Sequence, residues 1–339
     1  MEKSVQYGAW QAVNNCVRLK KGEKMVMITD LETQLIADVI YHEAAAVSSL
    51  KHPVFMMEKF GERTEDGSNP IKFPEEIAKE LADADVSFYC AKGKAGELQS
   101  FRKPMLKVIE ANKKLRHAHM PGMNEELMTT GMCADYAKVQ EVSKKVHDAV
   151  HNARRIRVTT PAGTDLTAYF SSQRKWVICD GLILPGNWSN LPDGEVFSCV
   201  TQAPKGKVIV DGTLGDFFCG KYGDMNQYPL IVDIKNGRIS QFHCANSLLM
   251  AEFWKYIEQD KEANRLAEFA IGTNVGLDRL VGNLLQDEKF PGVHVAFGDG
   301  YEGKTGCGWK SKAHVDCVMR NCTVYVDGKK IMEQSRFLI

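Results

Sequence analysis

The first 150 residues alternate between short apolar runs and longer segments in which apolar residues recur every three or four positions. The apolar runs have the length of strands and cover residues 24–30, 53–60 and 86–92, and a further strand that ends in a turn is expected at 116–122. The segments with helical spacing lie between them, at 32–49, 74–84 and 97–114. Such an alternation of strand and helix is typical of a doubly wound, mostly parallel sheet with helices on its faces. The pattern therefore predicts a Rossmann-like α/β domain at the N-terminus.

The pattern changes after a long predicted helix at 134–153. From Arg155 onward, short runs alternate apolar and polar residues and are separated by turn residues, as half-buried strands do. The clearest of these runs are 155–170, 206–214, 229–242 and 322–331, and helical spacing returns at 246–259 and 275–286. We therefore expect an α/β chain with a Rossmann-like domain over residues 1–153 and an α+β domain over residues 154–339.

Composition and charge exclude several classes of protein. Apolar residues make up 44% of the chain and charged residues 25%, as in ordinary globular proteins. Lysine plus arginine and aspartate plus glutamate both number 43, so no net charge attracts nucleic acid or an anionic membrane. No apolar run reaches the roughly 18 residues that span a bilayer, and the N-terminal residues lack the apolar centre of a signal peptide. We expect a cytoplasmic protein with no nucleic-acid or membrane partner.

Motifs for common cofactors are absent as well. The chain contains neither G-x-G-x-x-G nor G-x-x-x-x-G-K-[ST], so the predicted topology does not by itself imply a nucleotide. None of the ten cysteines forms a C-x-x-C pair, which argues against a zinc ribbon or a thioredoxin-type site. Several cysteines lie in strand-like runs, where we expect them to be reduced, buried thiols.

Two pairs of histidines resemble binding motifs but have simpler interpretations. His147 and His151 have the spacing of the helical zinc motif H-E-x-x-H, but Asp148 replaces the glutamate and the pair lies beside the apolar stripe of its helix. A solvated helix face is the better interpretation. His117 and His119 share one strand face at the end of a presumed parallel strand, where doubly wound sheets bind ligands. Substrate contact is the alternative there, and ordinary strand histidines are the main interpretation.

The second domain carries ionisable residues in apolar, strand-like surroundings. They are Glu195, Glu268, Asp287, Glu288, His294, His314 and Asp316, with Tyr301 close behind His294. In the run "KAHVDCVM", His314 and Asp316 are two apart and so point to the same face of a strand. A buried carboxylate is costly unless it is paired or bound to a metal. Mixed carboxylates and imidazoles suit a divalent metal ion, and additional carboxylates can bridge a pair of ions about 3.5–4 Å apart.

The same segments resemble the M29 metallo-aminopeptidases of the aminopeptidase T and aminopeptidase S type. The resemblance rests on "GTDL" at 163–166, "NLPDGEVF" at 190–197, "LAEFAIGTN" at 266–274, "DEKFPGVHVAFGDGY" at 287–301 and the later "HVD". It implies a homodimeric, metal-dependent hydrolase that cleaves a peptide or small amide bond with water activated by two divalent ions, zinc, cobalt or manganese. The metal ligands carried over are Glu195, Glu268, Glu288, His294, His314 and Asp316.

Within that resemblance, two residues have further roles. Glu268 or Asp316 would bridge the two ions, and Glu268 is also assigned to catalysis. Tyr301 would stabilise the oxyanion of the tetrahedral intermediate or bind a metal-bound water. The proton-shuttling carboxylate has no assignment at this point.

A related scaffold supplies the main alternative. The segment "AHVDCVMRNCTVYVDGKK" at 313–330 is closely similar to the 2,5-dihydroxypyridine 5,6-dioxygenases, whose length is also nearer to this chain. Those enzymes hold one non-haem Fe(II) with two histidines and one aspartate. Under this alternative His294, His314 and Asp316 are the iron ligands. That family has a histidine at the position of Glu268 and an apolar residue at Glu195, so these two positions favour the hydrolase. A catalytically silent metal-binding protein is the third interpretation.

Overall fold

The computed structural model describes residues 3–201 and 203–339. The chain forms two compact units. Unit 1 comprises Met1–Tyr136 with Gly181–Asp193, and unit 2 comprises Ala137–Asp180 with Gly194–Ile339. The division into domains at residues 153 and 154 stays a prediction, because these units are defined by compactness and not by independent folding. Among the described residues, no helix has the length and apolar character needed to cross a membrane.

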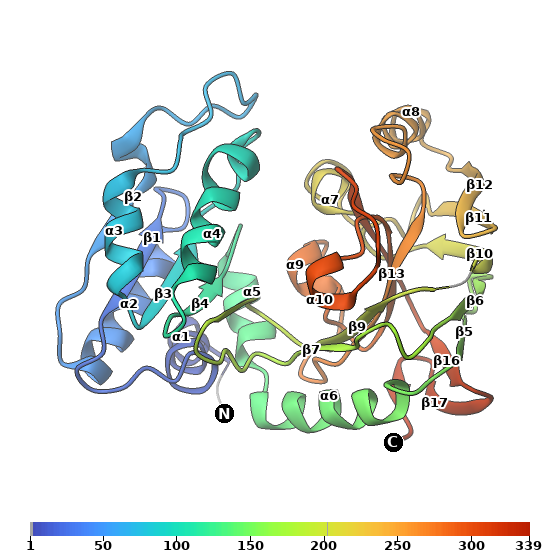
Figure 1. Cartoon of the computed structure of the whole chain (residues 1–339), viewed down its shortest axis with the longest axis horizontal. Helices are drawn as coiled ribbons and strands as arrows, with labels where there is room; N and C mark the ends of the chain where they lie inside the picture. Colours follow the sequence, from blue (N-terminus) through green and yellow to red (C-terminus); the bar gives the residue numbers. More distant parts are fainter. Residues whose placement is uncertain (1–2, 202) are drawn as a thin grey trace. The chain divides into compact units, whose positions relative to one another are not determined.

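Unit 1 is built on the parallel sheet that the sequence predicts. Its strands are β1 (Met25–Thr29), β2 (Val54–Met56), β3 (Val86–Cys90), β4 (Arg116–His119) and β8 (Asn187–Asn190). They lie in the order β2-β1-β3-β4-β8, and each neighbouring pair is parallel (Figure 1). The helices are α1 (Val5–Trp10), α2 (Gln34–Ser48), α3 (Glu75–Asp83), α4 (Lys103–Ala111) and α5 (Glu125–Thr129). The predicted N-terminal doubly wound fold is confirmed.

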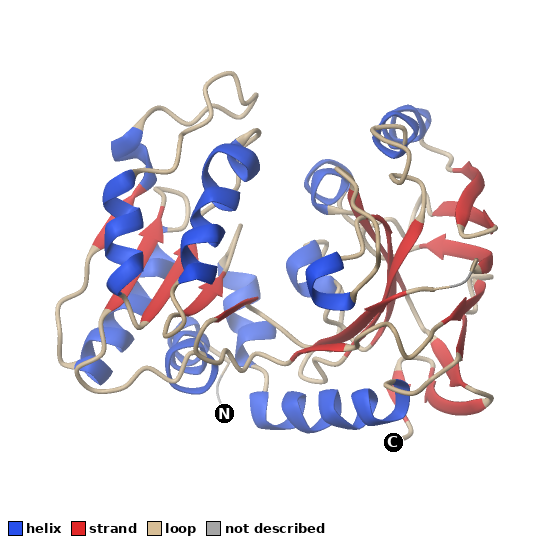
Figure 2. Cartoon of the chain, in the orientation of Figure 1, coloured by secondary structure: helices blue, strands red, loops and turns tan. Residues whose placement is uncertain are grey.

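Helices cover both faces of this sheet (Figure 2). Successive strand residues point to opposite faces, so each fully buried strand must be apolar on both. On one face Val26 and Ile28 of β1 pack in a cluster with Ile77 of α3 and Met105 of α4. The side chains between them, such as Met27, point to the other face and are also fully buried.

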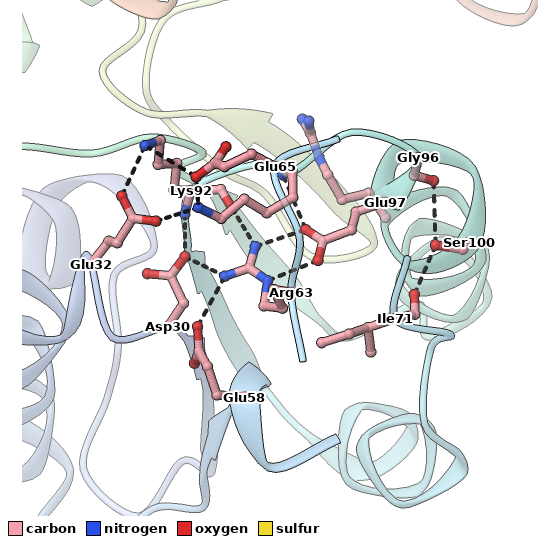
Figure 3. A network of polar contacts seen from close by, with 12 residues as sticks. Asp30, Glu32, Glu58, Arg63, Glu65, Ile71, Lys92, Gly96, Glu97 and Ser100 are labelled. Carbon is pink, nitrogen blue, oxygen red and sulfur yellow. Dashed lines mark hydrogen bonds and ion pairs between the residues drawn. The ribbon is translucent and has the colours of Figure 1, made fainter. Parts of the chain in front are cut away.

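The carboxyl end of this sheet is closed by a network of charged side chains. The strand order reverses between β1 and β3, which is where open α/β sheets usually bind a ligand. Figure 3 shows Arg63 in that position, between Asp30 after β1 and Glu97. Its Nη1 is 2.6 Å from Asp30 Oδ2, and its Nη2 is 2.7 Å from Glu97 Oε2. Lys92 adds a backbone N–H that donates to Asp30 Oδ2 at 2.7 Å.

The three central charged groups of this network are almost inaccessible to water. The side chains of Arg63, Asp30 and Glu97 are 2%, 0% and 1% exposed. Burial opposes the charged form of Arg63, but its hydrogen bonds with Glu97 and Asp30 raise its pKa overall. The chain's own guanidinium therefore fills the site where a related sheet would place a bound ligand, which agrees with the absence of nucleotide motifs.

His117 and His119 are buried strand residues. Arg102 Nη2 is 2.8 Å from His119 Nε2, His119 Nδ1 is 3.2 Å from His117 Nε2, and His117 Nδ1 is 2.8 Å from Ser87 Oγ. Because arginine can only donate, His119 accepts at Nε2 and donates from Nδ1, and His117 then donates to Ser87. Burial lowers the pKa of His117 to about 3. Both imidazoles are therefore neutral members of a hydrogen-bonded chain.

Unit 2 contains two antiparallel sheets. The larger has the order β12-β11-β10-β6-β5-β16-β17-β18, and the smaller has the order β15-β14-β13-β9-β7. The larger sheet consists of β5 (Arg155–Thr159), β6 (Asp165–Tyr169), β10 (Lys205–Val210), β11 (Leu230–Lys235), β12 (Arg238–His243), β16 (Thr323–Val326), β17 (Lys329–Glu333) and β18 (Arg336–Phe337). The smaller consists of β7 (Val177–Cys179), β9 (Glu195–Cys199), β13 (Leu266–Gly272), β14 (Gly292–Gly298) and β15 (His314–Met319).

The two sheets of unit 2 share one apolar core. Val158 and Leu166 of the larger sheet belong to the same buried cluster as Phe269 and Val295 of the smaller one. The helices that accompany them are α6 (Tyr136–Val150), α7 (Asp216–Tyr222), α8 (Ser247–Ile257), α9 (Leu284–Asp287) and α10 (Glu302–Thr305). An α+β second half was expected, and the fold-class prediction is confirmed.

One helix prediction is largely wrong. Helical spacing at 275–286 suggested a long helix, but only α9 at the end of that segment is helical. The carboxylate of Asp287 accepts hydrogen bonds from the backbone N–H groups of Val281 and Gly282, at 2.8 and 2.9 Å. Gly282 also has a left-handed backbone, with φ of +76°. These local bonds compete with helix formation, which residue spacing alone does not reveal.

Candidate metal centre

The predicted metal ligands lie on the smaller sheet of unit 2, on the face turned away from the shared core. Strand alternation separates the two roles, because Phe269 and Ile271 point into the core while Glu268 points to the opposite face. In the same way His294 alternates with the core residues of β14, and Asp316 with those of β15. In Figure 1, α9 and α10 lie on the opposite side of this sheet from β10, β6 and β5.

Small residues on the same face leave room between these side chains. Ala270 pairs with His294, and Ala296 pairs with both Glu268 and Asp316 across the antiparallel ladder. Gly298, which is opposite His314, has φ of +111°, and a Cβ there would lie 2.2 Å from the carbonyl oxygen of Ala313. A larger side chain at these positions would occupy the space in front of the polar groups.

The carboxylate of Glu268 lies between the two histidines. Its Oε1 is 3.5 Å from His294 Nε2, and its Oε2 is 3.9 Å from His314 Nε2. His314 Nε2 is in turn 3.2 Å from Asp316 Oδ1. Among the described residues, donor atoms lie within 4.8 Å of one another in two groups of this face, Glu195–Glu268–His294 and Glu288–His294–Asp316. Buried clusters of histidine, glutamate and aspartate capable of holding a metal ion are therefore present.

The ring of His314 is oriented for metal binding. Its Nδ1 is 2.9 Å from the carbonyl oxygen of Asp299 and donates to it, because a carbonyl only accepts. Burial opposes a charged ring, but Asp316 raises the pKa of His314 well above its ordinary value. When a metal ion displaces the second proton, the lone pair lies on Nε2, which faces Asp316 and Glu268. A backbone partner on the other ring nitrogen is the usual way of orienting a ligating histidine.

One buried atom of the centre has no hydrogen-bond partner. Glu268 Oε2 is inaccessible to water and accepts no hydrogen bond. An unsatisfied buried oxygen costs about 1–3 kcal/mol, and more when it is charged. A cation held beside Glu268 by His314 and Asp316 would compensate the charge of this oxygen, and the imidazole and carboxylate donors suit a transition metal. The residues present therefore fit a metal ion.

Burial controls the electrostatics of this face. It raises the pKa of Glu268, an effect that the hydrogen bond with His294 partly offsets. It also raises the pKa of Glu288 to about 8, although the nearby Lys289 charge opposes this. For His294 burial opposes the charged ring, but the contact with Glu268 raises its pKa overall to about 9. Protons are therefore shared between carboxylates and imidazoles, and a bound cation would displace them.

Lys289 is a part of this centre that the sequence analysis missed. Its side chain is 2% exposed, and its Nζ lies 2.6 Å from Glu195 Oε1 and 2.8 Å from Glu288 Oε1. A buried lysine requires partners of this kind. The available signal was a lysine directly after Glu288 inside an otherwise apolar run, "DEKFPGVHVAF". Two of the carboxylates predicted as metal ligands thus have an ammonium group between them.

Tyr301 lies at the edge of the centre. Its hydroxyl is 3.4 Å from His314 Nε2, and its backbone is left-handed, with φ of +56°. Burial of the hydroxyl and the charges of Glu268 and Asp316 raise its pKa well above the ordinary value, so the hydroxyl keeps its proton. The residue as a whole is 40% exposed, which marks this edge as the open side of the centre.

Comparison with known proteins identifies the family. The family profile of NicX, 2,5-dihydroxypyridine 5,6-dioxygenase, matches residues 6–339. The chain belongs to this family. The curated 2,5-dihydroxypyridine 5,6-dioxygenase of Pseudomonas putida KT2440 is 24% identical over 193 residues, which cover 53% of this chain and 53% of the relative. The match spans about half the length of that curated relative.

Two solved structures share the fold. The 2,5-dihydroxypyridine dioxygenase of Pseudomonas putida KT2440 superimposes with a TM-score of 0.69 at 16% identity and covers 98% of this chain and 96% of its own. AmpT from Thermus thermophilus gives a TM-score of 0.73 at 16% identity and covers 99% of both chains. At these identities the likeness shows the fold alone. The M29 resemblance therefore holds for the scaffold that the NicX family also uses.

The hydrolase interpretation is wrong. Membership of the NicX family and the curated relative both point to a ring-cleaving dioxygenase. The aminopeptidase and metallopeptidase assignments are therefore wrong as well. The interpretation relied on Glu195 and Glu268 as ligands that a single iron would not need. Glu195 has a different partner, because its Oε1 is 2.6 Å from the ammonium group of Lys289. Its presence is therefore no evidence for a second metal ion.

The other candidates lie outside this centre. His147 near the end of α6 and His151 just after it stack on each other, with ring centroids 5.5 Å apart, while Asp148 pairs with Lys144 at 2.6 Å. Asp287 accepts hydrogen bonds from the backbone of its own loop, as described above. The individual roles of Glu195, Glu268, Glu288, His294, Tyr301, His314 and Asp316 stay predictions.

Proposed function

We propose that the protein is a mononuclear non-haem Fe(II) dioxygenase that cleaves a dihydroxylated pyridine ring. The observation that carries the proposal is the convergence of two imidazoles and one carboxylate, those of His294, His314 and Asp316, in one buried centre of a NicX-family chain. This donor set is typical of non-haem iron oxygenases. The relative's name specifies a 2,5-dihydroxypyridine opened at its 5,6 bond, and we extend that substrate class to this chain.

His314 and Asp316 would hold the iron together with His294, and Glu268 lies beside both histidines. When bound, ferrous iron supplies the one-electron chemistry that lets O2 react with a hydroxylated ring. One ion is proposed here in place of the two implied by the M29 resemblance. The dimeric state and the cytoplasmic location stay predictions.

The surrounding residues position the substrate and its protons. Glu268 Oε2 has no hydrogen-bond partner and can accept the proton of a ring hydroxyl group. The protonated hydroxyl of Tyr301, next to His314 on the open side, can donate a hydrogen bond to a substrate oxygen. The apolar and small residues Phe197, Ala270 and Ala296 line the same face and exclude water from the ring.

The decisive experiment is oxygen uptake with 2,5-dihydroxypyridine. Protein stripped with a chelator and reloaded with Fe(II) is expected to consume one O2 for each ring lost, followed with an oxygen electrode and by the ultraviolet absorbance of the ring. The same protein reloaded with Zn(II) should be inactive, because zinc has no redox chemistry. Ring loss without oxygen consumption, or none with iron, would contradict the proposal.

The assignment of Glu268 has its own test. Glu268→Gln removes the proton acceptor but keeps the shape, so turnover of the iron-loaded enzyme is expected to fall by about 10²–10⁴-fold. Iron content should stay near the wild-type value, because His294, His314 and Asp316 remain. Glu302→Gln, at an exposed carboxylate on α10, is the matched control and should keep full turnover. Loss of iron together with activity would make Glu268 a ligand instead.

A further inference from the structure

The buried ammonium group of Lys289 lies where a two-metal site would need its second cation. Lys289 belongs to the loop between α9 and β14, and its side chain reaches the sheet face that carries the metal-ligand candidates. Its Nζ contacts one oxygen of Glu195 and one of Glu288, at 2.6 and 2.8 Å. With 2% of the side chain exposed, water cannot replace either contact.

Both carboxylates also lie close to His294. Glu195 Oε2 is 3.5 Å from His294 Nε2, so Glu195 lies between Lys289 on one side and His294 on the other. Glu288 belongs to a donor group with His294 and Asp316 within 4.8 Å. A metal ion held by Glu195 and Glu288 would therefore be placed beside the ammonium group, and their like charges repel strongly in a buried site.

In the other half of the centre, the described ion pairs of Glu268 and Asp316 are with histidines and not with a lysine or an arginine. Glu268 Oε2, His314 Nε2 and Asp316 Oδ1 face one another, and Glu268 Oε2 has no hydrogen-bond partner. This half adjoins Tyr301 and the open side. The chain therefore compensates one half of its carboxylate-rich face with its own cation and leaves the other half for an ion from solution.

We propose that Lys289 is a built-in cation that takes the place of a second metal ion and limits the centre to one ion, bound on the side of His314 and Asp316. The proposal rests on the proposed function only in identifying that one ion as the catalytic iron. It explains how a chain can keep Glu195 and Glu288 and still hold a mononuclear centre.

The test is metal stoichiometry measured with Mn²⁺ alone on the full chain. Equilibrium dialysis with elemental analysis should give about one equivalent for the wild type and about two for Lys289→Met, because the variant removes the ammonium group between Glu195 and Glu288. Electron paramagnetic resonance adds a second readout. The wild type should show the six-line signal of isolated Mn²⁺, and the variant should show the broadened signal of a coupled pair.

Three further variants guard against a simple folding defect. Lys289→Arg keeps the charge and should bind about one equivalent. Lys289→Met should melt at a lower temperature than the wild type without metal and recover with Mn²⁺. The charge-balanced Glu195→Gln/Lys289→Met should melt near the wild type and bind about one equivalent. Lys310→Met, at a lysine 81% exposed, is the surface control.

Several results would overturn the proposal. They are two equivalents bound by the wild type, one equivalent bound by Lys289→Met, or a Lys289→Met protein that stays unfolded in saturating Mn²⁺. The proposed function fails separately. A wild type that binds one ion but consumes no oxygen with 2,5-dihydroxypyridine refutes the dioxygenase and leaves the role of Lys289 intact.

Discussion

His314→Ala is expected to weaken Fe(II) binding by more than about 100-fold and to eliminate oxygen uptake. Loss of a group that only orients a metal ligand already costs 10–100-fold in affinity or activity, and a direct ligand should cost more. His314 Nε2 is 3.2 Å from Asp316 Oδ1, and the Asp299 carbonyl holds its ring in the ligating tautomer. Iron content after desalting and oxygen uptake measure the two effects.

The fold should tolerate this change. The side chain of His314 is 23% exposed, whereas that of His294 is 2% exposed, so truncation at position 314 leaves little buried cavity. The melting temperature of the metal-free variant should therefore stay close to that of the metal-free wild type. His151→Ala removes an exposed histidine from the turn that follows α6 and should change neither iron content nor activity. Iron retained at the wild-type level in His314→Ala would exclude His314 as a ligand.

Arg63→Met is expected to lower the free energy of unfolding of unit 1 by about 3–5 kcal/mol. Removing one partner of a buried ion pair leaves the other charge buried and unpaired. Here two carboxylates, Asp30 and Glu97, lose the same guanidinium (Figure 3). Hydrogen exchange of peptides covering β1 and β3 reports the change locally, and urea unfolding reports it for the whole chain.

The chain supplies a matched control for that prediction. Arg157 binds Asp165 with the same two-pronged geometry, at 2.8 and 2.7 Å, but their side chains are 51% and 55% exposed. Arg157→Met should therefore leave the free energy of unfolding nearly unchanged. If the two variants lost similar amounts of stability, burial would not be the reason for the importance of Arg63. Arg63→Met combined with Asp30→Asn and Glu97→Gln should recover part of the loss.

Most of the fold could be predicted from the sequence because residue spacing and burial are directly linked. Strands β1 and β3 were expected from short apolar runs, and α2, α3 and α4 from apolar residues at helical spacing. The failure at 275–283 had a specific cause. The Asp287 carboxylate accepts hydrogen bonds from the loop backbone. That contact depends on the turn of the chain and leaves no trace in the spacing of apolar residues.

The site was harder to interpret than to locate. Buried-strand surroundings were enough to select Glu268, His294, His314 and Asp316, which the antiparallel register then brings onto one face. The choice between two chemistries depended on whether Glu195 was available to a metal ion. Its partner Lys289 lies 94 positions further along the chain (289 − 195) and belongs to none of the metal-ligand motifs described above.

By itself the sequence determined the two fold classes, the absence of a nucleotide motif and the residues able to bind a metal. These follow from periodicity and residue chemistry, which are local properties. Only the tertiary structure decided which cation each carboxylate faces. Arg63 closes the end of the parallel sheet, Lys289 neutralises Glu195 and Glu288, and Glu268 keeps one oxygen without a hydrogen-bond partner. The physical reason is that a buried charge takes its role from its neighbours within about 4 Å, and these come from distant parts of the chain.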